Sequence, residues 1–358
     1  FGVVQAGGET WFARRLATVA DDLQACRPTI FMAVPRVWQK LHDVIIDELD
    51  AKPIHLGGSL DRLIAADTDP TRVRRSAKGL ATSAAAFVAN QTIGRAVRRK
   101  LGLDQARLLV SAAAPIHPDL VRWFHGIGLP IAEVYGQTED CGPATLNPPD
   151  AIRIGSVGRA IPGLEIRSAS DGELLVRGGS VCSGYFEMPE ATAELIDGAG
   201  WMATGDLGRV DDAGYVWLTG RKKDLIINAA GKNIAPSELE ARLSMEKLVG
   251  QAVVIGEGRR YLTALLTLDA DAAGEWANHH GASADITDLV HDSRLREAID
   301  ASVERVNREH APVEQIKYWR LLPAPLTVED GELTPTYKVK RSVVAERYAD
   351  LVETMYAT

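Results

Sequence analysis

The residues best suited to chemistry stand in short polar motifs beside apolar runs. Tyr135-Gly136-Gln137-Thr138-Glu139 ends and follows the apolar run Pro130–Tyr135. An aromatic ring at a strand end offers a flat face to a purine, and Gly136 allows a sharp turn. The Thr138 hydroxyl suits a phosphate oxygen, and the Glu139 carboxylate suits Mg²⁺. Taken alone, this motif is more typical of a strand-to-loop turn with solvated polar residues.

Two further motifs carry charge next to glycine. They are Thr204-Gly205-Asp206-Leu207 and Gly220-Arg221-Lys222-Lys223-Asp224. A carboxylate such as Asp206 can accept hydrogen bonds from both hydroxyls of a ribose. The alternatives are a turn or cap residue for Asp206 and a solvated hairpin end for Arg221.

A basic run near the C-terminus contains Lys338, Lys340 and Arg341. When a carboxylate attacks a phosphate, negative charge builds on both groups, and the compact ammonium of a lysine can bridge them. An isolated basic run is more often a solvated face. Lys338 is nevertheless the residue that we expect to act in catalysis.

The order of five motifs resembles the adenylate-forming superfamily, which includes acyl-CoA synthetases, luciferases and peptide-synthetase adenylation domains. Any one motif would be weak evidence, but their ordered occurrence over essentially the whole chain is specific. Segments 34–38 (Val-Pro-Arg-Val-Trp) and 333–336 (Leu-Thr-Pro-Thr) resemble the long-chain fatty acyl-CoA synthetase branch. The five motifs are Tyr135–Glu139, Gly184-Tyr185 with Pro189-Glu190-x-Thr192, Thr204–Leu207, Gly220–Asp224 and Leu333–Arg341.

The resemblance implies a role for each matching position. Lys338 matches the catalytic lysine of the family, with its register fixed by Arg341, and Lys223 matches the hinge. Thr138 and Glu139 are implied in catalysis, with Glu139 as the Mg²⁺ ligand. The implied nucleotide-binding residues are Ala113, Ala114, Pro115, Tyr135, Gly136, Thr138, Asp206 and Arg221. The implied CoA-binding residues are Gly231, Lys232 and Asn233, with Gly231 expected to allow a close backbone approach.

The same resemblance implies an activity. ATP would activate a fatty acid to acyl-AMP, and transfer to CoA would give acyl-CoA, AMP and pyrophosphate. ATP or AMP, Mg²⁺ and CoA are therefore the expected cofactors and co-substrates. Two alternatives stay open: a non-catalytic nucleotide-binding remnant, and an adenylating module that loads a carrier protein.

The distribution of apolar runs predicts an α/β fold in two domains. Residues 29–34 read as a buried strand with a turn at Pro35, and strand, helix and strand follow at 108–113, 117–124 and 130–135. Short strands around Asp-Gly turns indicate a small β subdomain at about 151–220. The resemblance implies that residues 1–221 are the remainder of a large adenylating domain with a parallel sheet. It also implies that the α+β domain expected at residues 222–358 is small and mobile.

Within that second domain, Ser237 and Glu240 have the spacing of a capping box. Val249–Ile255 and Leu262–Leu268 read as a strand pair, and the apolar residues from Leu295 to Val306 follow helical spacing.

Composition excludes several classes of protein. The net charge of −8 over 358 residues gives no general attraction to nucleic acid. No apolar run approaches the roughly 18 residues that cross a bilayer, so we expect at most peripheral membrane contact. Three cysteines without a C-x-x-C pair favour a reducing compartment, and we expect a cytoplasmic protein. The sequence leaves the oligomeric state and the acyl chain length open.

The family grips the β- and γ-phosphates of ATP with a Ser/Thr/Gly-rich loop that ends in Pro-Lys-Gly. Nothing between Phe1 and Pro35 resembles this loop. We therefore expect this 358-residue chain by itself to form acyl-adenylate at no useful rate. Pyrophosphate release with ATP, Mg²⁺ and a fatty acid measures this, and robust turnover would contradict the expectation.

Overall fold

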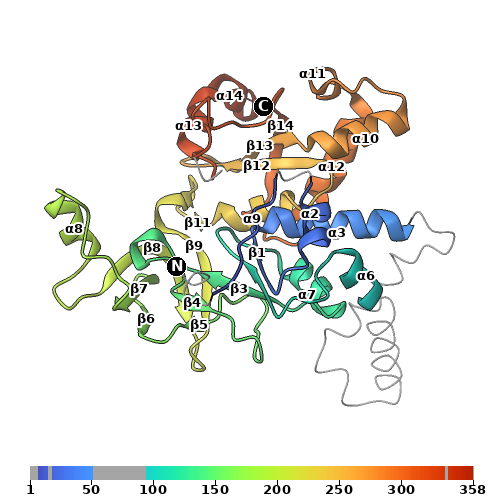
Figure 1. Cartoon of the computed structure of the whole chain (residues 1–358). Coiled ribbons are helices and arrows are strands. Elements are labelled where there is room, and N and C mark those ends of the chain that lie inside the picture. Colours follow the sequence, from blue (N-terminus) through green and yellow to red (C-terminus); the bar gives the residue numbers. More distant parts are fainter. Residues whose placement is uncertain (1–6, 15–17, 51–93, 335–337, 358) are drawn as a thin grey trace, which may run out of the picture. The chain divides into compact units, whose positions relative to one another are not determined.

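The computed structural model describes residues 7–14, 18–50, 94–334 and 338–357. The chain divides into two compact units, coloured mainly blue to yellow-green and gold to red in Figure 1. The first comprises residues 1–204 and 208–218, and the second comprises 205–207 and 219–358. The predicted α/β class is confirmed. The domain boundary after residue 221 and the hinge at Lys223 remain predictions.

The first unit contains a five-stranded sheet in the order β1-β2-β3-β4-β5. The pairs β1–β2 and β2–β3 are parallel, as predicted, and β4 and β5 join antiparallel. In the register, Val110 pairs with Ala132 and Ser111 with Glu133. The strands are β1 (Ile30–Ala33), β2 (Leu108–Ser111), β3 (Ile131–Tyr135), β4 (Thr145–Leu146) and β5 (Arg159–Ala160).

Aromatic side chains join the helices that cover this sheet. Trp38 is fully buried and makes edge contacts with Phe31 and Phe124, at ring-centroid distances of 5.1 and 5.2 Å. Trp123 is buried beside Phe124, so both tryptophans belong to the core. The helices of this part are α2 (Val19–Cys26), α3 (Pro35–Asp50), α6 (Arg95–Lys100) and α7 (Pro118–Gly126).

The first strand differs from its prediction in two respects. Ile30 and Met32 are 62% and 67% exposed, because β1 is the edge strand of the described sheet. Pro35 begins helix α3 rather than a turn, since a proline at the first helical position removes an N–H that has no partner inside the helix. Residues 36–110 are rich in Ala, Leu, Arg and Lys, which predicts helices, and part of this region, 51–93, lies outside the described residues.

A second sheet, in the order β6-β7-β8-β9, corresponds to the predicted β subdomain. The Asp171-Gly172 turn joins β6 and β7 into an antiparallel hairpin, with Gly172 at φ +84°. Asp211 closes the turn before β9 by accepting the backbone N–H groups of Ala213 and Tyr215. The elements are β6 (Leu164–Ser168), β7 (Glu173–Gly178), α8 (Pro189–Leu195), β8 (Met202–Val210) and β9 (Val216–Arg221).

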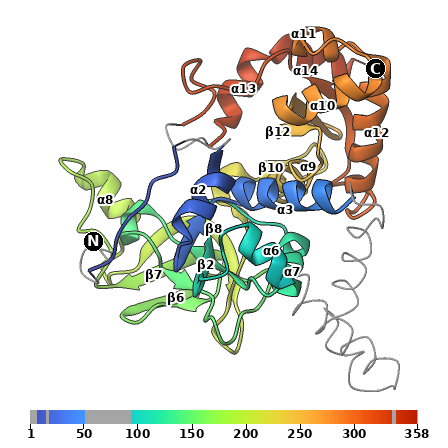
Figure 2. The same cartoon turned by 45° about the vertical axis from the view of Figure 1, so that its right-hand side comes forward.

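The second unit is built on a three-stranded sheet buried on both faces, with antiparallel β12–β13 and parallel β13–β14 pairs (Figures 1 and 2). Leu266 packs with α9, α10 and α12 on one face, while Leu265 packs with α13 and α14 on the other. The predicted strand pair and helix are thus confirmed. The elements are β12 (Val249–Ile255), β13 (Leu262–Leu268), β14 (Ile316–Leu321), α9 (Pro236–Leu243), α10 (Ala270–His280), α11 (Ile286–Leu289), α12 (Ser293–Asn307), α13 (Arg341–Arg347) and α14 (Ala349–Tyr356).

The predicted capping box at Ser237 and Glu240 is wrong. Pro236 occupies the first position of α9, and Ala235 is the cap residue without a side-chain hydrogen bond. Ser237 therefore lies inside the helix, too late to act as a cap. The Glu240 carboxylate instead accepts the backbone N–H of Val254 at 2.7 Å.

We predict that Leu266→Ala lowers the unfolding free energy of the second unit by roughly 2–5 kcal/mol, because the site is fully enclosed and leaves a cavity. Val313, which is 40% exposed, supplies the control Val313→Ala with an expected change within about 0.5 kcal/mol. Denaturant unfolding measures both. Equal losses for the two variants would contradict the assigned core.

Candidate active site

The turn that follows β3 is formed by a close backbone approach. A Cβ on Gly136 would lie 1.7 Å from the carbonyl oxygen of Gly142, so only glycine fits there. Tyr135 is buried at the end of β3, and its carbonyl accepts the N–H of Ala144 at 2.8 Å. The chain therefore leaves the sheet at a fixed point and direction, which determines where Thr138 and Glu139 begin.

Asp140 organises the next turn and was missed by the sequence reasoning. Its buried carboxylate accepts the backbone N–H of Gln137 at 2.9 Å, and the Gln137 side chain reciprocates as in a capping box. The short helix η3 (Thr138–Asp140) results. The Gln137-x-x-Asp140 spacing is the signal that could have identified it.

Glu139 is joined to a motif more than forty residues away. The Tyr185 hydroxyl donates to Glu139 Oε1 at 2.8 Å, and the Cys182 N–H donates to the Glu139 carbonyl at 2.7 Å. The hydrogen bond to this carboxylate is the main cause that raises the pKa of Tyr185. The motif Tyr135–Glu139 and the motif that contains Gly184-Tyr185 are thus joined in one site.

The loop that carries Tyr185 is held by Thr192. Thr192 Oγ1 accepts the Tyr185 N–H and donates to the Met188 carbonyl, each at 2.9 Å. A Cβ on Gly184 would lie 2.3 Å from the Thr192 methyl group, so a larger residue would separate the two. The glycine and threonine of this motif therefore fix the position of Tyr185.

Ala113, Ala114 and Pro115 are exposed and follow the end of β2. Because β2 and β3 are parallel neighbours, this segment and the turn after Tyr135 leave the same edge of the sheet, the usual ligand site of open α/β sheets. Ala113 has a φ of +72°, which a side chain disfavours by about 1–2 kcal/mol. Strained backbone of this kind concentrates at functional sites.

Glu133 is a buried carboxylate beneath this edge of the sheet. It is 7% exposed, and its Oε2 accepts the Gly155 N–H at 3.1 Å. Burial raises the pKa of Glu133 from 4.5 to about 7, against the opposing effect of the Gly155 hydrogen bond. Sequence reasoning missed this group, because one acidic residue within an apolar run gives no pattern.

Asp206 and Arg221 form an ion pair between β8 and β9. Arg221 Nε donates to Asp206 Oδ1 at 2.8 Å, with 12% of the aspartate side chain and 51% of the arginine side chain exposed. The resemblance implied a ribose contact for Asp206 and a nearby ribose or phosphate contact for Arg221, and the structure places the two side chains side by side. They can present one carboxylate and one guanidinium to the same ligand.

The predicted CoA loop is closed by hydrogen bonds from its backbone to the side chain of Asn228. Asn228 Oδ1 accepts the N–H groups of Ala230 and Lys232, each at 3.0 Å, and Asn233 begins β11 (Asn233–Ile234) opposite β10 (Ile226–Ile227). Gly231 has a φ of +72°, but no atom lies within 4 Å of a built Cβ. The positive φ is one reason for a glycine here, and the approach of CoA expected at this residue stays a prediction. Lys223 lies exposed in the short helix η4 (Lys222–Asp224).

Lys338 is exposed on a segment with β-type contacts at its base. Its N–H donates to Thr334 Oγ1 at 3.0 Å, and its carbonyl accepts the Thr334 N–H at 2.8 Å. Leu333 and Val339 form a bridge just outside this pair. The predicted catalytic and nucleotide-binding residues thus fall into three local groups, around Glu139, Asp206 and Lys338.

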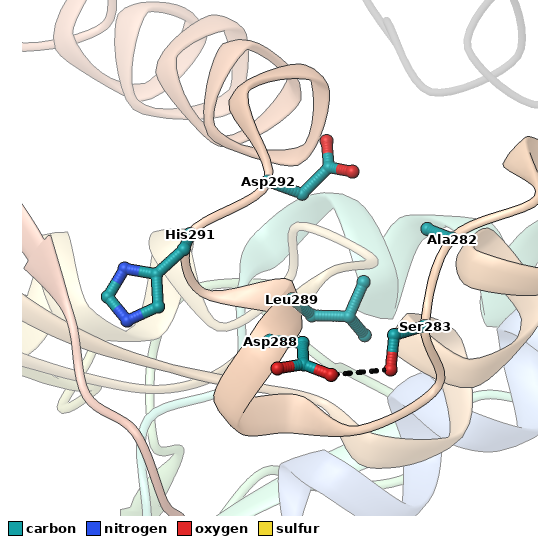
Figure 3. A pocket seen from close by; sticks show the side chains of 6 residues that line it. All are labelled: Ala282, Ser283, Asp288, Leu289, His291 and Asp292. Carbon is teal, nitrogen blue, oxygen red and sulfur yellow. Dashed lines mark hydrogen bonds between the residues drawn. The ribbon is translucent and has the colours of Figure 1, made fainter.

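An open hollow in the second unit lies apart in sequence from every predicted site residue (Figure 3). Ser283 donates to Asp288 at 2.8 Å there, and Asp292 caps α12 and pairs with Arg294. These local contacts account for its carboxylates.

Among the described residues, no group of three or more His, Cys, Asp or Glu side chains is arranged to hold a metal ion. A single carboxylate beside a hydroxyl, as at Glu139 and Thr138, suits Mg²⁺ when phosphates and waters complete the shell.

Two solved structures share the fold of this chain. The chain superimposes on the A domain of a carboxylic acid reductase from Segniliparus rugosus, determined with AMP and a carboxylic acid, with a TM-score of 0.72 at 24% identity. The alignment covers 99% of this chain and 51% of that one. ATP-bound MatB from Rhodopseudomonas palustris gives 0.59 at 23% identity, covering 98% and 56%. The chain therefore has the fold of an adenylating domain.

Sequence comparison identifies the family. The profile described as AMP-binding enzyme matches residues 1–186, and that of the AMP-binding enzyme C-terminal domain matches 223–358. The chain belongs to the AMP-binding enzyme family, which confirms the resemblance to adenylate-forming enzymes.

Two curated relatives are named as long-chain fatty acid–CoA ligases. Long-chain-fatty-acid–CoA ligase FadD15 of Mycobacterium bovis is 39% identical, covering 96% of this chain and 57% of the relative. Long-chain-fatty-acid–CoA ligase ACSBG2 of Xenopus laevis is 33% identical, covering 98% and 51%. The chain thus spans about half the length of these relatives.

The raised pKa of Glu133 predicts a pH-dependent stability. The folded chain binds this proton more tightly than the unfolded chain, so stability from this group is present below pH 4.5 and is lost as the pH rises through about 7. The loss is on the order of 3 kcal/mol. Glu133→Gln keeps an acceptor for Gly155 and should become increasingly more stable than the parent between pH 5 and 8.

Denaturant unfolding of the parent and the variant at pH 5 and at pH 8 measures the change in stability. Glu194→Gln, at an exposed position on α8, is the control, and its difference from the parent should not vary with pH. A Glu133→Gln difference that is equally independent of pH would refute the assignment.

Proposed function

We propose that the natural full-length protein is an ATP-dependent fatty acid–CoA ligase that works through an acyl-adenylate. One observation carries this proposal. The Tyr185 hydroxyl donates to the Glu139 carboxylate, which joins two of the motifs just beyond the ends of the parallel strands β2 and β3. The names of the relatives, at 39% and 33% identity, supply the substrate class.

In the first half-reaction, an oxygen of the fatty acid carboxylate attacks the α-phosphorus of ATP. The bond from that phosphorus to the bridging oxygen breaks, and pyrophosphate leaves with the electron pair. Tyr135 and the segment Ala113–Pro115 would hold adenine, Thr138 a phosphate oxygen, and Asp206 with Arg221 the ribose. Glu139 would hold Mg²⁺, which neutralises phosphate charge when bound.

Lys338 would act on the charge that develops in this step. Its ammonium group can lie between the attacking carboxylate and the α-phosphate, and stabilise both as the transition state forms. Its exposure at the end of a short segment is what this role requires, because a buried ammonium could not reach a ligand.

In the second half-reaction, the CoA sulfur attacks the acyl carbonyl, the bond to AMP breaks, and the thiol proton is released. The loop with Gly231, Lys232 and Asn233 would guide CoA after rotation at Lys223. The positive φ of Gly231 supports a loop shape that a larger residue would strain.

Free CoA is the preferred acceptor over a carrier protein. The relatives named as CoA ligases reach 39% identity, whereas the A domain of carboxylic acid reductase reaches 24% and shares the fold alone. Comparing CoA with a pantetheine-loaded carrier in a thiol-dependence assay tests this choice.

A cytoplasmic location fits the cysteines, since Cys26, Cys141 and Cys182 are all unpaired thiols. Among the described helices, none combines the length and apolarity needed to cross a bilayer.

We predict that Lys338→Ala in the full-length protein lowers acyl-adenylate formation by roughly 10²–10³-fold, because it removes a charge that stabilises the transition state. Thioester formation from supplied acyl-adenylate should change little. Lys340→Ala, an exposed lysine two residues away, is the matched control. Pyrophosphate release and acyl-CoA formation are measured separately. Unimpaired adenylation in Lys338→Ala would refute the mechanism.

A further inference from the structure

The segment that carries Lys338 is anchored on its N-terminal side by a buried carboxylate. Glu332 is 1% exposed, and its Oε2 accepts the Thr327 N–H at 3.0 Å. Its Oε1 accepts the Tyr348 hydroxyl at 3.1 Å, which ties the segment to the junction of α13 and α14. The Glu332 carbonyl also accepts the Lys340 N–H at 2.8 Å. One side of the loop is therefore fixed to the body of the second unit.

A second carboxylate anchors the C-terminal side. Arg341 is the first residue of α13 and forms a two-point ion pair with Glu240 of α9, with Nη2 at 2.9 Å from Oε2 and Nη1 on Oε1. Arg341 Nη1 also donates to the Val254 carbonyl at 2.7 Å. Because Glu240 accepts the Val254 N–H as well, three elements meet at one carboxylate.

The geometry of this pair makes it more than a surface contact. Its side chains are 25% and 19% exposed, and both guanidinium nitrogens that face Glu240 are used. A forked, two-point pair fixes orientation as well as distance. Removal of one partner leaves a partly buried charge without its counter-ion, which costs more than loss of an exposed pair. The start of α13 is thereby held in one position.

Arg341 lies three residues after Lys338, so this position determines where the ammonium group points. Transition-state stabilisation depends on placement to within about 1 Å. We propose that Glu240 is a positioning residue for Lys338, acting through Arg341, and that its effect is confined to acyl-adenylate formation. This inference rests on the function proposed for Lys338.

The test uses Glu240→Gln in the full-length protein, because glutamine keeps an acceptor for Val254 but removes the charge. We expect kcat for pyrophosphate release to fall at least about 10-fold, with KM for ATP and fatty acid within twofold. Thioester formation from supplied acyl-adenylate should stay within twofold. Arg341→Lys, which keeps the charge but loses the fork, should show the same split and serves if Glu240→Gln fails to fold.

Glu246→Gln is the matched control. Glu246 lies just after α9, has 10% of its side chain exposed and pairs with Arg242 and Arg305, so it is a comparable carboxylate away from the Lys338 segment. It should leave both half-reactions within twofold. Equal losses in both half-reactions for Glu240→Gln, or no loss in adenylation, would overturn the proposal.

Lys338→Ala, measured in parallel, separates the positioning role of Glu240 from the catalytic role of Lys338. If Lys338→Ala abolishes adenylation while Glu240→Gln and Arg341→Lys do not reduce it, only the positioning role fails. If Lys338→Ala is itself without effect, the proposed function of the lysine fails, and the positioning role falls with it.

Discussion

The parallel pairing of β2 with β3 is the constraint on which the candidate nucleotide site depends. It sets Ser111 beside Glu133, so the chain leaves both strands at the same edge of the sheet. Ala113–Pro115 and the turn after Tyr135 are thereby neighbours, although about twenty residues separate them in sequence. A slip of one residue would turn alternate side chains to the other face and separate these groups. The close contact of Gly136 with Gly142 then gives the second exit its direction.

The features predicted from sequence are those with local causes. Apolar runs indicated the parallel strands and the pair β12–β13, and Asp-Gly and Asp-x-Gly turns indicated the hairpins, because these signals act within a few residues. Two of the errors have local causes as well. Pro35 and Pro236 each begin a helix. The Ser237–Glu240 spacing indicated a start later than the true start at Pro236. Ile30 and Met32 resemble core residues by type, and only the strand order shows that they lie on an edge.

The contacts that define the site could not be predicted, because they join residues distant in sequence. Tyr185 with Glu139 and Arg341 with Glu240 are ordinary charged or polar residues in their own segments. Nothing in a helical or turn pattern identifies a partner 46 or 101 residues away. The same holds for Glu133, whose burial follows from a sheet that covers it rather than from its neighbours in sequence.

A common arrangement links the three local groups. The carboxylates proposed to face the nucleotide each have a fixed partner, Tyr185 for Glu139 and Arg221 for Asp206. Lys338, by contrast, is exposed, while the carboxylates near it serve the backbone and the helix behind it. A group that stabilises charge only during one step should be free to approach and withdraw, yet its direction should not vary. Anchoring the base of the segment, and leaving the ammonium itself exposed, satisfies both requirements.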